Sequence, residues 1–195
     1  MQALNLFIVR LPKKFKDTVE VAGQELYLAS KFNEFENRYN YGEIVSTPAK
    51  FNTGASVGDT LYFHHHICVE SKYHLQEDLY MVQYEPDGGY GSHAYAFQPP
   101  SGSVVMLSDW VFVRPPEKED EQKTTSGIIL LEQESKVEDH GEIIYSSDAI
   151  EEAGAKAGDT VYFSKSSDYA MEVNGEKVWR MRINDLLYVD HGKKE

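Results

Sequence analysis

Three short blocks of sequence occur twice in this chain, in the same order and at nearly the same spacing. Residues 7–12 (FIVRLP) return as 111–116 (VFVRPP), 41–45 (YGEIV) as 140–144 (HGEII), and 56–63 (SVGDTLYF) as 156–163 (KAGDTVYF). Convergent strand-and-turn patterns rarely keep order and spacing together, whereas a duplicated folding unit does. We therefore predict two tandem copies of one unit, residues 1–107 and residues 108–195.

Each repeated block has the composition of a β-strand or of the turn before one. Residues 7–9 and 111–113 are apolar runs that lead to proline, which cannot donate to a strand ladder. In the Gly-Asp-Thr blocks, glycine permits a positive φ and the aspartate can bond nearby backbone. Helical periodicity is nearly absent, and only residues 33–37 and 149–155 are compatible with a helical turn. The predicted fold class is all-β, with short strands in partly open, barrel-like units.

The junction between the two copies contains no flexible linker. Residues 95–97 and 104–107 are predicted to pair as strands around the Pro-Pro-Ser-Gly turn at 99–102. Only a Ser-Asp dipeptide separates this pair from the apolar run 110–113. We therefore expect the two partly open barrels to be packed together.

The charge balance excludes two classes of partner. The chain carries 19 basic and 32 acidic side chains, a formal net charge of −13. Nucleic-acid binding requires clustered Lys and Arg, and anionic lipid repels an acidic surface. No segment approaches the roughly 20 apolar residues of a membrane span. Because the chain has one cysteine and no leader-like N-terminus, we expect a cytoplasmic protein, in a bacterium or in a phage-infected host.

One segment combines strongly charged flanks with a short aliphatic run. In residues 117–139, the run Ile128-Ile129-Leu130-Leu131 lies between stretches rich in Glu, Asp, Lys and Thr. Burial of such flanks does not offset the entropy cost of ordering the chain. The composition predicts a mobile loop that presents a small apolar patch. A hairpin whose aliphatic strand belongs to the core is the alternative that composition alone leaves open.

The second copy resembles the GroES family of co-chaperonins from residue 110 to residue 189. The elements that carry the resemblance are, in order, 109–114 (DWVFVR), 126–130 (SGIIL), 141–144 (GEII), 157–163 (AGDTVYF) and 184–189 (NDLLYV). The Gly-Asp turn alone is weakly specific, but five elements in order are a strong signal. The first copy, residues 5–107, is similar to a diverged version of the same GroES-like unit.

The resemblance implies a function without catalysis. Family members carry an aliphatic tripeptide after a glycine on a mobile loop, and the tripeptide docks on the apical domain of the chaperonin. In this chain those residues are Gly127, Ile128, Ile129 and Leu130. The implied function is a co-chaperonin that caps the chamber of a GroEL-type chaperonin and assists ATP-dependent folding of an unfolded client protein. The resemblance implies no cofactor.

The resemblance also implies a homo-oligomer, a ring of seven members. Its subunit interface would pair a strand near the N-terminus with a strand near the C-terminus of a neighbour. The residues concerned are Leu6, Phe7, Ile8 and Val9 in one chain and Leu186, Leu187, Tyr188 and Val189 in the next.

Three features depart from the family pattern. Ser126 stands where the family has a glycine before Gly127, and residues 146–155 are too short for the roof hairpin of bacterial members. In the first copy, residues 19–28 alternate apolar and polar side chains around Gly23, which predicts a turn-linked hairpin where a mobile loop would begin. We therefore do not expect the first copy to bind a chaperonin as the second copy does.

A run of histidines gives the main alternative. In an extended strand, His64 and His66 project to one face and His65 to the other, with His74 and His93 as further candidates. Neutral imidazoles hold zinc or copper, but no carboxylate or second cysteine at strict ligand spacing completes a set. We therefore predict no metal site, with His64 and His66 as the alternative ligand pair. A metal-binding β-barrel protein and a phage structural or assembly protein are the alternative functions.

An enzyme requires a nucleophile with a base, or a cofactor site. Ser164, Ser166 and Ser167 lie near Lys165 and Asp168 in the sequence, but there is no Gly-x-Ser-x-Gly elbow. The Gly-x-Gly-x-x-Gly fingerprint of a nucleotide-binding half is also missing. The sequence therefore predicts a protein that is not an enzyme.

Overall fold

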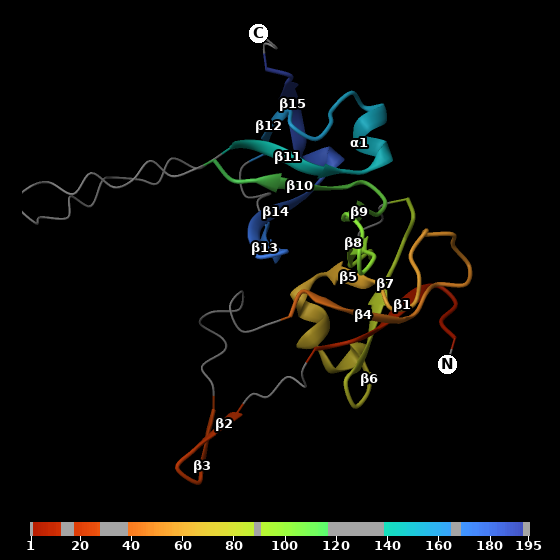
Figure 1. Ribbon diagram of the computed structural model, residues 1–195, viewed down its shortest axis with the longest axis vertical. Helices are drawn as coiled ribbons and strands as arrows, with labels where there is room; N and C mark the ends of the chain where they lie inside the picture. The colour runs from red at the N-terminus through yellow and green to blue at the C-terminus, as the bar shows by residue number, and fades with distance from the viewer. Residues whose placement is uncertain are drawn as a thin grey trace, which may run out of the picture. The chain divides into compact units, whose positions relative to one another are not determined.

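Strands dominate the computed structural model, which describes residues 2–12, 18–27, 39–87, 91–116, 139–164 and 169–192. The chain divides into two compact units (Figure 1). Unit 1 comprises Met1–Trp110 with Ser147–Ala149, and unit 2 comprises Val111–Ser146 with Ile150–Glu195. The prediction of an all-β fold built on two β domains is confirmed. The packing of the two copies against each other stays a prediction.

Unit 1 contains a seven-stranded sheet with the order β6-β7-β1-β4-β5-β8-β9. Its strands are β1 (Leu6–Arg10), β4 (Tyr41–Ser46), β5 (Thr60–Phe63), β6 (His74–Gln76), β7 (Leu79–Gln83), β8 (Ala94–Gln98) and β9 (Val105–Met106). Neighbouring strands run antiparallel. Two 3-10 helices, η1 (His65–Cys68) and η2 (Ser71–Tyr73), follow β5 in the chain.

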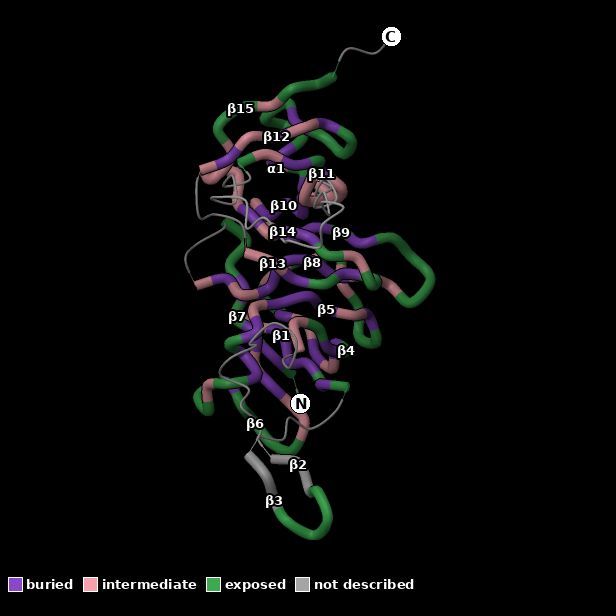
Figure 2. The backbone as a smooth tube through the Cα atoms, turned by 90° about the vertical axis from the view of Figure 1, so that its left-hand side faces the viewer, coloured by how far each residue is buried: buried purple, intermediate pink, exposed green. Residues whose placement is uncertain are grey.

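The core of unit 1 comes from the inward side chains of these short strands. Phe7 and Val9 on β1, Ile44 on β4, and Leu61 and Phe63 on β5 are completely buried. The tube in Figure 2 is accordingly purple along β1 and β5. In contrast, β4 alternates between exposed and buried positions, because successive side chains of a strand point to opposite faces.

Unit 2 contains a six-stranded sheet with the order β13-β14-β10-β11-β12-β15. Its strands are β10 (Trp110–Arg114), β11 (His140–Ser146), β12 (Thr160–Phe163), β13 (Tyr169–Val173), β14 (Glu176–Arg182) and β15 (Leu186–Asp190). The helix α1 (Asp148–Glu152) forms where a helical turn was expected, and the 3-10 helix η3 (Ile183–Asp185) precedes β15. Val113, Ile143 and Val161 are completely buried in the core of this unit.

The two sheets share one strand order. The series β6-β7-β1-β4-β5-β8 of unit 1 matches the series β13-β14-β10-β11-β12-β15 of unit 2. The register also agrees, since Val9 pairs with Ile44 and Val113 pairs with Ile143, each directly after an irregularity in the ladder. The repeated sequence blocks therefore occupy equivalent places in two sheets of the same topology.

Two local predictions for the first copy are confirmed. A separate two-stranded sheet joins β2 (Thr18–Val21) and β3 (Gln24–Tyr27) as a hairpin. Its two turn residues, Ala22 and Gly23, both have positive φ, as a two-residue hairpin turn of type I′ requires. The predicted pairing of residues 95–97 with 104–107 appears as β8 beside β9.

Candidate functional site

The predicted chaperonin-binding residues belong to a segment that connects two paired strands of unit 2. Gly127, Ile128, Ile129 and Leu130 lie outside the described residues. On either side of this segment, β10 ends at Arg114 and β11 begins at His140. These two strands are antiparallel neighbours, and Arg114 lies opposite Glu142 in their ladder. The segment therefore starts and ends on one strand pair.

Arg114 forms the centre of a charged cluster beside these strand ends. Its Nη1 atom lies 2.7 Å from Oε2 of Glu142, and its Nε donates to Oε1 of Glu176 at the start of β14. These contacts, Glu176 first and Glu142 second, raise the pKa of the guanidinium group. The cluster connects β10, β11 and β14 by side-chain contacts in addition to the backbone ladder.

Sequence reasoning did not identify this cluster, although a signal was present. The arginine and the glutamate both occur in the repeated blocks, and unit 1 has the same arrangement. Arg10 contacts Glu43 at 3.6 Å and Asp78 at 3.3 Å. The recurrence of these charged residues at equivalent places of the two copies was therefore a signal for a contact that each unit forms within itself.

Gly141 allows β11 to pass closely over β10. A Cβ atom at this position would lie 2.5 Å from the backbone oxygen of Arg114 and 2.5 Å from Cγ1 of Val113. Gly42 in unit 1 has the same role, since its Cβ would lie 2.8 Å from the backbone oxygen of Arg10. The glycine of the repeated Gly-Glu-Ile block is therefore required by a close backbone approach.

The Gly-Asp turn of unit 2 positions β12 beside β11. Gly158 has a φ of +91°, and the buried carboxylate of Asp159 accepts a hydrogen bond from the backbone of Lys156 at 3.0 Å. The same Oδ2 atom lies 3.1 Å from Nδ1 of His191, just after β15. The predicted turn chemistry, with positive φ at glycine and a backbone bond to aspartate, is confirmed.

β15 forms one edge of the sheet of unit 2. It pairs with β12 on one side and is the last strand of the sheet on the other. Leu187 is 64% exposed and Tyr188 is 60% exposed. The ring of Tyr188 stacks on Tyr162 at 4.3 Å between centroids, and Tyr162 stacks on His140 at 5.4 Å. Part of the predicted interface, Leu186 to Val189, therefore lies on an accessible sheet edge.

β1 has a different environment. It lies between β7 and β4, so both of its edges are paired within unit 1. Phe7, Ile8 and Val9 are buried, and Leu6 is partly buried. Within the chain, β4 and the hairpin of β6 and β7 therefore occupy both sides of β1, and the interface predicted at Leu6 to Val9 stays a prediction. Local sequence patterns do not reveal which strand a distant hairpin joins.

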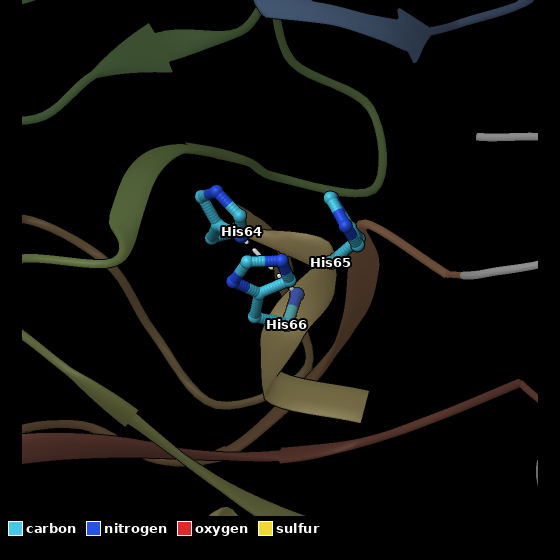
Figure 3. Close-up of side chains that lie close together, drawn as sticks. All are labelled: His64, His65 and His66. Carbon is cyan, nitrogen blue, oxygen red and sulfur yellow. Dashed lines mark hydrogen bonds between the residues drawn. The ribbon is translucent and has the colours of Figure 1, made fainter. Parts of the chain in front are cut away.

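The histidine run adopts a different structure from the one expected. Residues 65–68 form the 3-10 helix η1 rather than a strand, so the alternation that separated His65 from His64 and His66 does not apply. All three imidazoles lie together (Figure 3). The ring of His93 lies 6.1 Å from that of His64, whereas His74 contacts Tyr80 and the backbone oxygen of Glu77. The two histidines considered as metal ligands from the sequence, His64 and His66, are therefore joined by His65.

Comparisons with known proteins agree with the sequence resemblance. The family model described as the chaperonin 10 Kd subunit matches residues 103–189. A co-chaperonin GroES of Porphyromonas gingivalis is 39% identical over 89 residues, which cover 45% of this chain and 98% of that protein. A co-chaperonin GroES of Methylobacillus flagellatus is 34% identical over 92 residues, covering 44% of this chain and 94% of that protein.

These matches also decide between the functional classes considered from the sequence. Chaperone components of this family are not enzymes, as the sequence predicted, and the alternatives of a phage structural protein or a metal-binding barrel protein are not favoured. Within the part of the chain that the structure describes, no helix has the length and hydropathy of a transmembrane span. The matched region, residues 103–189, contains β9 to β14, β15 as far as Val189, and the segment between β10 and β11. The chain belongs to the co-chaperonin GroES family.

Proposed function

We propose that this protein caps the chamber of a GroEL-type chaperonin and assists the ATP-dependent folding of an unfolded client protein in the bacterial cytosol. The observation that carries the proposal is the match to curated GroES proteins over 98% of the length of one relative. The sequence contains no nucleotide-binding motif, so nucleotide chemistry belongs to the chaperonin. The proposal assigns chaperonin binding to Gly127, Ile128, Ile129 and Leu130.

The aliphatic triplet accounts for reversible capture in energetic terms. Burial of one Ile or Leu side chain contributes about 1.5–3 kcal/mol, and ordering each residue of a flexible segment costs about 1–2 kcal/mol. A single triplet therefore binds weakly. Several triplets carried by one ring bind tightly, because every contact after the first is intramolecular. The lid leaves when the chaperonin changes its apical surface with its nucleotide state.

We further propose that chains assemble into a ring along β15, with seven members as the family resemblance implies. The strand of unit 1 that matches β15 is β8, and the outer edge of β8 is occupied by β9, the short strand before β10. This pairing supports an equivalent pairing between β15 and the residues directly before β1 in a neighbouring chain. The proposed contact thus shifts from β1, whose two edges are already paired, to the segment that precedes it.

Substitutions in the triplet test the proposal of chaperonin binding. Ile129→Asp places a charge in the apolar contact and is expected to abolish co-sedimentation with a GroEL-type chaperonin in the presence of ATP. Ile129→Val keeps an aliphatic side chain and serves as the matched control, with capture close to that of the unchanged protein. Capture of the Asp variant with unchanged affinity would contradict the assignment.

A further inference from the structure

Three imidazole rings meet at the start of η1 in unit 1. The ring centroids are 4.7 Å apart for His64 and His65, 4.3 Å for His64 and His66, and 4.5 Å for His65 and His66. Each side chain offers one nitrogen atom, and these three atoms all lie within 4.8 Å of one another. Figure 3 shows the rings of His64 and His66 next to each other, with the ring of His65 near them at the start of η1. Consecutive residues of an extended strand would not converge in this way.

The backbone that carries these rings is fixed on both sides. The backbone N–H of His64 donates to the oxygen of His93 at 3.0 Å, which attaches it to the segment before β8. The oxygen of His64 accepts from Ile67 at 3.1 Å, and the oxygen of His66 accepts from Val69 at 3.0 Å. Ile67 is completely buried, and His65 is only 4% exposed. The imidazoles are therefore brought together by the fold, so a ligand would not have to order this part of the backbone.

The rings differ in their access to solvent. His66 is exposed, His64 is partly buried and His65 is buried. An ion at this cluster would therefore be reached from the side of His66 while His65 holds it from within. Glu70 follows η1, and the contact of its carboxylate with Lys72 at 2.6 Å lowers the pKa of Glu70, with His66 and His93 contributing in the same direction.

We propose that His64, His65 and His66 form a binding site for one transition-metal cation of the Zn²⁺ class. Neutral imidazole suits Zn²⁺, Cu²⁺ and Ni²⁺, whereas Mg²⁺ and Ca²⁺ prefer oxygen ligands. Three protein ligands leave one position of a tetrahedral Zn²⁺ site open for water. A tetrahedral Zn²⁺ ion lies about 2.0–2.1 Å from each nitrogen. This requires the nitrogen atoms to lie closer together than the 4.8 Å that bounds their separation here. Binding therefore draws the rings inward by side-chain rotation.

The site competes with a hydrogen bond that the structure contains. Nδ1 of His64 accepts a hydrogen bond from the backbone N–H of His66 at 3.1 Å, which caps η1 (Figure 3). A neutral imidazole has one lone pair, so a nitrogen that accepts this bond cannot bind a metal at the same time. Metal binding by His64 therefore replaces the cap of η1. Because this hydrogen bond is lost when the metal binds, we expect the backbone at the start of η1 to change on metal binding.

Titration of the tag-free full-length chain with ZnCl₂, after dialysis against a chelator, tests the site. We expect one high-affinity equivalent of Zn²⁺ for each chain by calorimetry and by metal analysis. His66→Ala removes one proposed ligand of the metal. Loss of a residue that only supports a ligand weakens metal binding about 10–100-fold, so we expect at least this effect on Zn²⁺ affinity. His74→Ala is the matched control, because His74 lies in the same unit and contacts Glu77 and Tyr80 instead of the cluster. That variant is expected to bind Zn²⁺ as the unchanged chain does.

Two further measurements distinguish a loss of Zn²⁺ binding from a loss of the fold. His66→Gln preserves a polar side chain at an exposed position, and circular dichroism of both His66 variants checks that the fold is retained. Hydrogen exchange is expected to change in peptides that contain η1 when Zn²⁺ is added, and MgCl₂ is expected to have no effect. Absence of stoichiometric Zn²⁺ binding, unchanged binding in folded His66 variants, or equal loss in His74→Ala would overturn the proposal.

Discussion

Arg114 and Glu142 face each other across β10 and β11, with Nη1 and Oε2 separated by 2.7 Å. Arg10 and Glu43 occupy the same register positions on β1 and β4 of unit 1, at 3.6 Å. The two pairs stand at the ends of the strands that enclose the segment 117–138 in one copy and the β2–β3 hairpin in the other. Equivalent strand ends thus carry inserted segments of different sequence, in line with the expectation that the first copy does not bind a chaperonin as the second copy does.

The Arg114 pair is expected to contribute little to stability. The two side chains are 43% and 47% exposed, so solvent screens their attraction. Arg114→Gln should therefore lower the free energy of unfolding by at most about 1 kcal/mol, the range of exposed ion pairs. Urea denaturation measures this change, and Arg10→Gln provides the comparison in unit 1. A loss well above that range would show that the contact with Glu176 is more important than the exposure of the pair indicates.

Gly141→Ala is expected to destabilise unit 2 because the new Cβ would lie 2.5 Å from the backbone oxygen of Arg114. Backbone atoms cannot move away as a side-chain end can, and overpacking of this kind costs about 1–3 kcal/mol. Thermal or urea denaturation gives the measurement. In the control, Gly91→Ala, the new Cβ meets the carboxylate end of Glu85, which can rotate away. Equal stability of the two variants would refute the role assigned to Gly141.

Asp159→Ala is expected to weaken the junction of β11, β12 and the C-terminal end of β15. The substitution leaves the backbone N–H of Lys156 without its carboxylate and removes the contact with His191. Loss of one partner of a buried hydrogen bond costs about 1–3 kcal/mol. The equivalent substitution, Asp59→Ala, removes a bond of 2.8 Å to the backbone of Ser56 and should have a similar effect in unit 1. Denaturation curves unchanged by both substitutions would contradict this account of the turn.

Leu187→Asp is expected to impair ring assembly without unfolding the chain, because Leu187 is exposed on β15, the last strand of this sheet among the described residues. Native mass spectrometry should give seven chains for the unchanged protein and smaller species for this variant. Val57→Asp is the matched control, since Val57 is 66% exposed and lies in a turn of unit 1. Assemblies of four or fewer chains in the unchanged protein would contradict the proposed stoichiometry, and an intact ring in the Leu187 variant would exclude the β15 edge.

Local patterns predicted those parts of the fold that depend on short stretches of sequence. The turn at Gly158 and Asp159, the hairpin around Gly23 and the pairing of β8 with β9 were all accessible in this way. Each depends on residues close in sequence, where turn chemistry and alternation are informative. The family resemblance added the co-chaperonin class, which composition alone left open.

Long-range arrangement was the part that the sequence did not reveal. The position of β7 beside β1 depends on a partner some 70 positions away, and the apolar run at Phe7 gives no sign of it. The histidine run was interpreted as a strand, although Ile67 and Cys68 continue it into a 3-10 helix packed on the core. In both cases tertiary packing decided the structure, because an apolar pattern of a few residues fits more than one conformation.

The aliphatic triplet at Ile128 to Leu130 is the proposed contact of this chain with a GroEL-type chaperonin. The most direct test is co-sedimentation of the full-length chain with such a chaperonin, with ATP and without it. We predict capture in the presence of ATP, much weaker capture in its absence, and loss of capture in Ile129→Asp. A chain that stays unbound under both conditions, while a bacterial GroES control is captured, would contradict the proposed binding to the chaperonin.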